Sequence, residues 1–375
     1  MTTEVFVPRL VDASQLNPQN YNARMLLSRW TAADFGIRTL AYDEPDSRVA
    51  SRGGIRVVRL WRRHLWQAHL FLQYLHPCGA VFYPGVSAAD FAGLRGRRAV
   101  GLRGPIIATL EGLVGDKERE QFYSSVAGHP VHCQPVTERE LKHCDYILQT
   151  ADHVIAISPF LGRMGQARYG DKFSVLPLGV DVGTFYPAAM QPIRTVRTVV
   201  SAGRVAAHKR PEVFLDLAER FPGVRFKWFG EGDRRKALIA AAAARNIENV
   251  EFPGSRPPER LAEEFRAANI FVLPSRCEGV PKVTQEAAAC GLPVVAFGHY
   301  EAPSVVHGRN GFVVWSDDEF IARTGELLTN PVLASHMGRC GVTMSQEWNW
   351  NLLAPRWESA LIKAIAASGT RSKAG

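Results

Sequence analysis

Twelve short apolar segments of strand-like composition recur along the 375-residue chain, separated by stretches of helical periodicity. This alternation indicates an α/β fold, because near-continuous apolar runs suit parallel strands that are buried on both faces. The expected strands of the first half span residues 4–8, 37–42, 80–84, 105–110, 154–158 and 173–177. Those of the second half span residues 198–203, 225–230, 249–254, 270–275, 293–298 and 311–315. The sequence therefore predicts two doubly wound α/β domains.

A stretch without periodicity separates the two halves of the chain. The segment FYPAAMQPIRTVRT carries two prolines and no strand or helix pattern, so we expect a linker there. We predict an N-terminal domain over 1–187, a linker over 188–197 and a C-terminal domain over 198–354. A last helix is expected over 355–368, where it either packs back on the first domain or caps the second. Helical patterns also predict helices over 19–34 and 138–151.

The composition is that of a packed soluble protein, with 46% apolar and 22% charged residues. Six cysteines show no CxxC pair and no metal-ligand spacing, so we expect reduced thiols in a cytoplasmic protein. The first residues lack the pattern of a secretory signal, and no apolar run approaches the roughly 18 residues that span a bilayer. These features exclude a disulfide scaffold and give no sign of a membrane span.

The positive charge is concentrated in one segment. The formal net charge is +9, and residues 48–103 alone contain ten arginines and one acidic residue. One-sided charge of this kind suggests an anionic partner surface. A membrane-surface helix would suit the cluster Trp61, Arg62, Arg63 and Trp66, and an ordinary basic helix with its tryptophans packed inward suits it equally. No nucleic-acid recognition motif is present, so nucleic acid is not an expected partner.

The segment CEGVPKVTQE, residues 277–286, places Glu278 in a loop after an expected strand and Glu286 on the following helix. Pro281 suits the first turn of that helix, and Gly291 is expected to end it. Ligands of open α/β sheets bind beyond the carboxyl ends of strands, where this loop lies. Two solvated surface acids are the alternative. The context predicts that the two acids meet different parts of one ligand.

A second loop carries positive charge. In SAGRVAAHKRP, an expected strand ends at Gly203, Arg204 follows it, and Lys209 precedes the helix-opening Pro211. A helix N-terminus offers unpaired N–H groups and a positive dipole end, and nearby cations complete an anion site. Arg204 and Lys209 are therefore candidates for holding a diphosphate, with solvated surface cations as the alternative.

A glycine pair follows the strand over 225–230. Gly230, Glu231 and Gly232 form half of a dinucleotide fingerprint, but Arg235 stands where the third glycine would be, so a plain tight turn is the alternative. The chain contains no DxD, HExxH or GxSxG motif. Local sequence therefore supports neither metal catalysis nor a serine hydrolase.

Taken together, these motifs resemble the retaining GT-B glycosyltransferases of family 4, the glycosyl transferases group 1. In chain order, the series is Gly203-Arg204 with Lys209, Gly230-Glu231-Gly232, Glu278-Gly279 with Glu286, and CGLPVVA. The stretch VLPLGVDVGTFYP at 175–187 is similar to the end of that family's first domain. The resemblance extends over about residues 150 to 350.

The resemblance implies two Rossmann-like domains facing each other across a cleft, and a last helix that crosses back to the first domain. It implies transfer of a sugar from a UDP- or GDP-linked donor to a hydroxyl of a glycan or lipid-linked glycan. The transfer would retain the anomeric configuration and need no metal or other cofactor. A nucleotide-sugar epimerase or glycan phosphorylase of the same fold is the alternative. A lipid-linked acceptor would suit a cytoplasmic enzyme attached peripherally to the inner face of the cell membrane.

The resemblance also assigns residues. It places Arg204 and Lys209 on the donor diphosphate. Glu278 would hold the transferred sugar and Glu286 the ribose hydroxyls. Arg204, Lys209 and Glu278 are thereby candidate catalytic residues. The remaining donor contacts that it implies are Gly203, Gly230, Glu231, Gly254, Gly279, Val280 and Pro281.

The chain departs from the family pattern at several positions. The loop after the first strand carries Asn20 and Asn22 and lacks the usual glycine pair. Glu111 stands where many relatives have a histidine near the acceptor. Asn20, Asn22 and Glu111 are therefore candidates for the acceptor side, and Glu111 is a further candidate for catalysis. In the second domain, Ser304 replaces a common glutamate.

Overall fold

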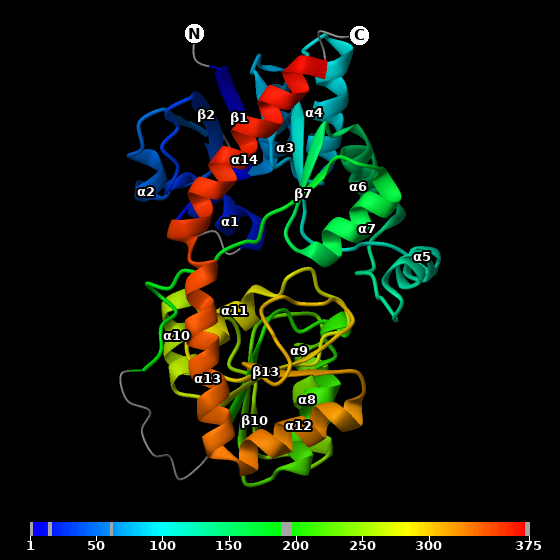
Figure 1. Ribbon diagram of the computed structural model, residues 1–375, viewed down its shortest axis with the longest axis vertical. Helices are drawn as coiled ribbons and strands as arrows, with labels where there is room; N and C mark the ends of the chain where they lie inside the picture. The colour runs from blue at the N-terminus through cyan, green and yellow to red at the C-terminus, as the bar shows by residue number, and fades with distance from the viewer. Residues whose placement is uncertain (1–2, 14–16, 61–62, 189–196, 372–375) are drawn as a thin grey trace. The chain divides into compact units, whose positions relative to one another are not determined.

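The computed structural model describes residues 3–13, 17–60, 63–188 and 197–371 (Figure 1). The chain forms two compact units, each built from pieces that are distant in sequence. Unit 1 comprises Met1–Gly115, Pro135–Gly179 and Trp350–Gly375. Unit 2 comprises Asp116–Gln134 and Val180–Asn349. Residues 189–196 of the predicted linker lie outside the described residues.

Unit 1 contains a parallel sheet of seven strands in the order β3-β2-β1-β4-β5-β6-β7. The strands are β1 (Thr3–Leu10), β2 (Phe35–Ala41), β3 (Ile55–Arg59), β4 (Ala80–Phe82), β5 (Ile106–Leu110), β6 (His153–Ala156) and β7 (Phe173–Val175). Neighbours β1 and β4 are not consecutive in the chain, so the winding direction reverses between them. Such a switch point is where open α/β sheets bind ligands.

Unit 2 contains a parallel sheet of six strands in the order β10-β9-β8-β11-β12-β13. The strands are β8 (Thr198–Ala202), β9 (Arg225–Phe229), β10 (Val250–Glu251), β11 (Ile270–Leu273), β12 (Val294–Phe297) and β13 (Gly311–Val314). All residues of β8, β11 and β12 are buried, as expected for central parallel strands. Here the switch point lies between β8 and β11.

Helices cover the strands in both units. Those of unit 1 are α1 (Pro18–Leu27), α2 (Ser47–Ala50), α3 (Trp66–Leu75), α4 (Ala88–Ala99), α6 (Glu138–Thr150), α7 (Pro159–Tyr169) and α14 (Trp350–Arg371). Those of unit 2 are α5 (Lys117–Ala127), α8 (Pro211–Arg220), α9 (Arg235–Ala244), α10 (Pro258–Arg266), α11 (Lys282–Ala289), α12 (Asp317–Thr329) and α13 (Pro331–Ser345). Among the described residues, no helix combines the length and apolarity needed to cross a membrane.

Each of the twelve predicted strands is present, and the prediction missed β3. This strand, IRVVR, lies at the edge of the sheet and exposes both of its arginines. The search for near-continuous apolar runs does not detect an edge strand with one solvated face. The predicted helix over 138–151 is confirmed as α6.

The predicted helix over 19–34 is too long, because α1 ends at Leu27. The residues that follow α1 bind α14 instead. The Trp30 indole donates to the Ala354 carbonyl at 2.8 Å, and the backbone N–H groups of Thr31 and Ala32 donate to the Glu358 carboxylate. This contact confirms that the last helix packs on unit 1 (Figure 1).

Helix α14 begins at Trp350, five residues before the predicted start at Pro355. Its buried side chains repeat at helical spacing, which gives the helix one continuous apolar face: Trp350, Leu353, Ala354, Trp357, Leu361 and Ala364. The Trp357 indole donates to the Pro177 carbonyl at 2.8 Å, which fixes the helix to the segment after β7.

The division into units differs from the sequence-based boundaries at 187 and 198. Unit 2 begins at Val180 and also includes Asp116–Gln134, a segment we name the strap. The sequence analysis assigned the strap to the N-terminal domain. It carries no strand of the first sheet, and its contacts are with residues after β12 and β13.

Replacing Glu358 with alanine should destabilise unit 1. The carboxylate accepts three hydrogen bonds from Thr31 and Ala32, and its removal leaves two backbone N–H groups without this partner. Such a loss typically costs about 1–3 kcal/mol. Urea unfolding followed by tryptophan fluorescence measures it. Glu347→Ala, at an exposed glutamate, should change stability by less than about 0.5 kcal/mol. Equal stability of the two variants would contradict this role of Glu358.

Candidate functional site

The loops that follow β8 and β11 meet at the switch point of unit 2. The Arg276 N–H donates to the His208 carbonyl at 3.1 Å. Lys209 forms an ion pair with Glu278, and only 15% of the lysine side chain and 10% of the glutamate side chain are exposed. The structure therefore brings together one predicted cation and one predicted acid in a mostly buried pair.

The lysine is oriented by an unusual backbone turn. A 3-10 turn, Ala207–Lys209, leads into Arg210, which has a φ of 50° and precedes Pro211 at the start of α8. Arg210 is paired with Asp317, and its guanidinium lies 5.1 Å from the centre of the Phe297 ring. These contacts stabilise the loop that carries Lys209.

Arg204 lies apart from this pair. Its side chain is 69% exposed, and its nearest acid is Asp233, at 4.0 Å. Between Arg204 and Lys209, burial lowers the pKa of His208, and the charge of Lys209 lowers it further. The structure thus places one of the two predicted cations in the pair with Glu278 and leaves the other at the surface.

The glycine pair after β9 is required by close packing. A Cβ atom on Gly230 would lie 2.0 Å from the Gly203 carbonyl oxygen, and one on Gly232 would lie 2.2 Å from the Val205 carbonyl oxygen. Gly254 has a φ of 82°, and a Cβ there would lie 2.4 Å from a Glu231 carboxylate oxygen. These glycines let the loops after β8, β9 and β10 approach one another.

Glu286 lies on α11, which begins and ends where the sequence predicted. The residue is partly buried, and burial raises the pKa of its carboxyl group, while Lys282 opposes this shift. Within the described part of the chain, the carboxylate has no hydrogen-bond partner or ion pair. A partly buried carboxylate without a partner is costly unless a ligand supplies one.

Ser304 is buried and serves the packing of α11. Its hydroxyl lies 2.7 Å from the Thr284 hydroxyl, and its carbonyl accepts from the Asn310 side chain at 2.9 Å. Within the described residues, Ser304 therefore links α11 to the segment before β13, which accounts for a serine at this position.

The strap brings histidines to the carboxyl ends of β12 and β13. His129 lies 2.9 Å from the Glu301 carboxylate, and its ring contacts the Trp315 ring edge-on at 5.2 Å. The His132 ring lies 5.1 Å from the His299 ring. Burial lowers the pKa of both His132 and His299. Burial therefore favours the neutral imidazole at both positions.

The polar residues predicted for the acceptor side lie at the switch point of unit 1. Asn20 accepts a hydrogen bond from the Leu10 N–H at 3.3 Å, at the end of β1. Asn22 and Glu111 both hydrogen-bond the hydroxyl of Tyr83, the residue that follows β4. The sequence analysis missed Tyr83 and its neighbour Arg9. Only their positions in the sequence could have indicated them, since each lies at the end of an expected strand.

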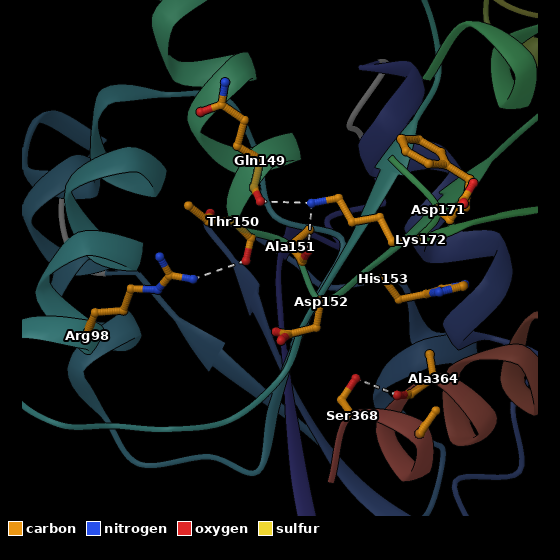
Figure 2. Close-up of a pocket in the computed structure, with 12 residues that line it drawn as sticks. Arg98, Gln149, Thr150, Ala151, Asp152, His153, Asp171, Lys172, Ala364 and Ser368 are labelled. Carbon is orange, nitrogen blue, oxygen red and sulfur yellow. Dashed lines mark hydrogen bonds between the residues drawn. The ribbon is translucent and has the colours of Figure 1, made fainter. Parts of the chain in front are cut away.

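A cavity of about 520 Å³ lies beside the amino ends of β6 and β7 in unit 1 (Figure 2). Arg98 and Lys172, which line it, donate hydrogen bonds to carbonyl groups at the carboxyl end of α6. Arg98 donates to the Thr150 carbonyl at 3.1 Å, and Lys172 donates to the carbonyls of Gln149 and Ala151 at 2.8 and 3.0 Å. These contacts cap a helix, and we assign the cavity no functional role. No group of three or more potential metal ligands occurs among the described residues.

The comparisons with known proteins agree with the motif series. Residues 196–330 match the family described as Glycosyl transferases group 1. The matched segment lies within unit 2 and contains the loops of the Lys209–Glu278 pair. A D-inositol 3-phosphate glycosyltransferase of Segniliparus rotundus is 31% identical to the chain over 49% of this chain and 45% of that protein. The chain thus spans about half the length of that relative.

A second relative matches over most of the chain. The GDP-mannose-dependent alpha-(1-6)-phosphatidylinositol monomannoside mannosyltransferase of Mycolicibacterium smegmatis is 26% identical over 94% of this chain and 91% of that protein. Among solved structures, sucrose-phosphate synthase from Thermosynechococcus elongatus has a TM-score of 0.76 at 20% identity, covering 97% of this chain and 100% of that one. Anabaena HepE, crystallised with UDP and glucose, has a TM-score of 0.73 at 16% identity, covering 96% and 100%. These structures confirm the predicted GT-B fold class.

Acid should weaken unit 2 through His132 and His299. Each has a lower pKa in the folded protein than in the unfolded chain, so the unfolded chain binds protons first as the pH falls below about 6.5. The contribution is complete above that pH and is lost as the pH falls further. Urea unfolding at about pH 7.5 and about pH 5.5 measures it. His132→Asn/His299→Asn should lose less stability between these pH values than a His336→Asn control at an exposed histidine. Equal losses would contradict this origin.

Proposed function

We propose that this protein is a glycosyltransferase that moves a sugar from a nucleotide diphosphate sugar to a hydroxyl of a glycan or lipid-linked glycan. The observation that carries the proposal is the Lys209–Glu278 pair at the switch point of unit 2, inside the segment that matches the group 1 family. Relatives named as glycosyltransferases favour sugar transfer over the epimerase and phosphorylase alternatives.

In the proposed donor complex, Lys209 contacts the diphosphate and holds Glu278 against the transferred sugar. Arg204 is exposed, so its side chain is able to turn toward the diphosphate without breaking a buried contact. Glu286 binds the ribose hydroxyls, which would supply the partners that its carboxylate lacks. Backbone groups of the loop before α11 complete the site at Gly279, Val280 and Pro281.

The proposed reaction breaks the bond between the anomeric carbon and the diphosphate, which leaves negative charge on the departing group. Lys209 and Arg204 stabilise that charge, together with backbone N–H groups. We propose that no metal takes part, because the cations do this work. Retention by attack on the same face of the sugar accords with the family resemblance, and it lets the departing phosphate accept the acceptor's proton.

The names of a relative and of a solved structure suggest two candidate nucleotides for the donor. The mannosyltransferase of M. smegmatis is named as GDP-mannose-dependent, and the HepE crystals contain UDP. We therefore propose a UDP- or GDP-linked sugar. The names of these relatives mention an inositol phosphate and a phosphatidylinositol monomannoside, which both carry polyol hydroxyls.

Glu286→Gln should abolish stabilisation by nucleotide. A ligand at about 100 times its dissociation constant stabilises a protein by roughly 2.7 kcal/mol, which raises the melting temperature measurably. Thermal unfolding of the wild type with UDP, GDP and ADP, and with their sugars, tests this. Glu263→Gln, at an exposed glutamate paired with Arg260, should keep the wild-type shift. An unchanged shift in Glu286→Gln would remove the ribose assignment, and no shift with any nucleotide would remove the proposed function.

Lys209→Met should leave nucleotide binding measurable and slow the transfer. Loss of a group that stabilises transition-state charge typically raises the barrier by about 2.7–4 kcal/mol, or roughly 100- to 1,000-fold in rate. Release of UDP or GDP from the donor found by the thermal panel measures this. The control is Lys227→Met, which changes a lysine of β9 that is paired with Glu264 on α10. Wild-type turnover in Lys209→Met would contradict the diphosphate assignment.

We also propose that the enzyme docks on an anionic membrane, through a surface smaller than the whole segment 48–103. Several arginines of this segment are neutralised, because Arg48, Arg56 and Arg59 pair with Asp46, Glu4 and Glu44. Arg97 is buried and donates to backbone carbonyls. Trp61 and Arg62 lie outside the described residues, and nothing is described of the Arg63 side chain.

The remaining surface lies on α3 and α4, which pack closely because a Cβ on Gly93 would lie 2.4 Å from the Tyr74 ring. Leu65 and Leu72 are 50% and 59% exposed and lie two helical turns apart. Arg95 is exposed on the adjacent α4. Apolar side chains beside cations suit the boundary between lipid headgroups and acyl chains.

Leu72→Glu should abolish sedimentation with phosphatidylglycerol vesicles, because it places a negative charge on the proposed docking face. Vesicles of phosphatidylcholine should not bind, and salt should weaken binding to the anionic vesicles. Leu352→Glu, at an exposed leucine of α14, is the matched control and should sediment like the wild type. Sedimentation of Leu72→Glu at the wild-type level would contradict this surface.

A further inference from the structure

A buried polar cluster occupies the carboxyl ends of β1, β4 and β5 in unit 1, and the proposed donor site does not use it. Its members are Arg9 near the end of β1, Asn22 on α1, Tyr83 after β4 and Glu111 after β5. Because β1 and β4 flank the switch point of the sheet, the cluster lies where α/β sheets bind ligands.

Tyr83 has a left-handed backbone, with a φ of 60°, although it is a bulky residue and fully buried. Such a conformation is unfavourable and persists only where several contacts impose it. Arg9 supplies three of them: its Nε donates to the Tyr83 carbonyl at 3.0 Å, its Nη2 donates to the Pro84 carbonyl at 3.0 Å, and its guanidinium lies 4.3 Å from the centre of the Tyr83 ring. A fourth contact joins the Tyr83 N–H to the Ile107 carbonyl at 2.9 Å.

The strained backbone directs the phenol at Glu111. Burial raises the pKa of Tyr83 well above 10, and the charge of Glu111 raises it further, so the phenol keeps its proton. The hydroxyl donates that proton to the Glu111 carboxylate and accepts a hydrogen bond from the Asn22 side chain. A carboxylate held by a donor of fixed position stays in one orientation.

The loop after Tyr83 is fixed as well. Asp90 accepts hydrogen bonds from the Gly85 N–H at 3.2 Å and from the Ser87 N–H at 3.0 Å. Tyr74 donates to the same carboxylate at 2.7 Å and is fully buried. Tyr74 and Tyr83 are thus both fully buried tyrosines that donate to a carboxylate, and the Tyr74–Asp90 pair has an evident role in holding a loop. Asp90 is itself buried, whereas Glu111 is partly exposed.

We propose that Tyr83 is a positioning residue that holds Glu111 ready to accept a hydrogen bond from the acceptor hydroxyl. The proposal rests on the proposed function, since it concerns the acceptor of that reaction. A carboxylate that is already oriented binds a sugar or polyol hydroxyl without the entropy cost of fixing its own side chain. Arg9 takes part indirectly, by imposing the backbone conformation of Tyr83.

The test uses hydrolysis of the donor, in which water takes the place of the acceptor. The donors are UDP-glucose, UDP-N-acetylglucosamine and GDP-mannose, and kcat/KM is measured against pH. Protonated Glu111 is neutral and accepts a hydrogen bond from water more weakly than the carboxylate does, so the wild type should lose activity at acid pH. Tyr83→Phe removes a hydrogen bond to the charged carboxylate, which should move this acid limb upward by on the order of one pH unit. Glu111→Gln replaces the charged acceptor by a neutral amide that does not titrate, which should lower kcat/KM about 10-fold and abolish the limb.

Tyr74→Phe is the matched control, because it removes the same chemical group from the other buried pair. It should destabilise the protein about as much as Tyr83→Phe and leave the acid limb in place. Both variants should keep the wild-type thermal shift with UDP or GDP. Coincident pH profiles for Tyr83→Phe and Tyr74→Phe, or a wild type without an acid limb, would overturn the role of Tyr83 and leave the proposed function in place. A wild type that neither binds nor hydrolyses any of the donors would overturn the proposed function, and this inference with it.

Discussion

The contact between the loops after β8 and β11 is the interaction on which the proposed donor site depends. The Arg276 N–H fixes one loop to the His208 carbonyl, and the Lys209–Glu278 ion pair joins the two loops at their tips. A pair that is this buried gains little net stability, because desolvation of both charges offsets their attraction. Its value lies in geometry, since each charge fixes the position of the other. The carboxylate and the ammonium group are therefore oriented before a ligand arrives.

The loops at the switch points of the two units are held by different kinds of contact. In unit 2, glycines allow the loops to approach, and the charges at the switch point remain partly accessible. In unit 1, the contacts after β1 are made by side chains. Buried Asp12 accepts hydrogen bonds from the N–H groups of Tyr42 and Asp43, and Arg24 donates to the Asp12 carbonyl. Side chains, rather than a close approach of the backbone, thus fix Asp12, the second residue after β1.

Local sequence predicted most of the fold, and it singled out Lys209 and Glu278, which the structure brings together. The buried strands are apolar because both of their faces are covered, so their positions appear in the sequence directly. The charge balance of residues 48–103 could not be predicted in this way, since the acids that neutralise Arg56 and Arg59 come from β1 and from the loop after β2. Tyr83 was missed for a similar reason. Its left-handed backbone is imposed by Arg9, which is 74 residues away in the chain.

The strap shows a further limit of sequence-based boundaries. Its helix α5 has ordinary periodicity and ordinary caps, and it belongs to unit 2 because of contacts such as His129 with Glu301, 172 residues apart. These contacts join residues that are far apart in the sequence, so no local pattern assigns the strap to unit 2. The boundary of a unit is set by long-range contacts, which a search for local periodicity does not detect.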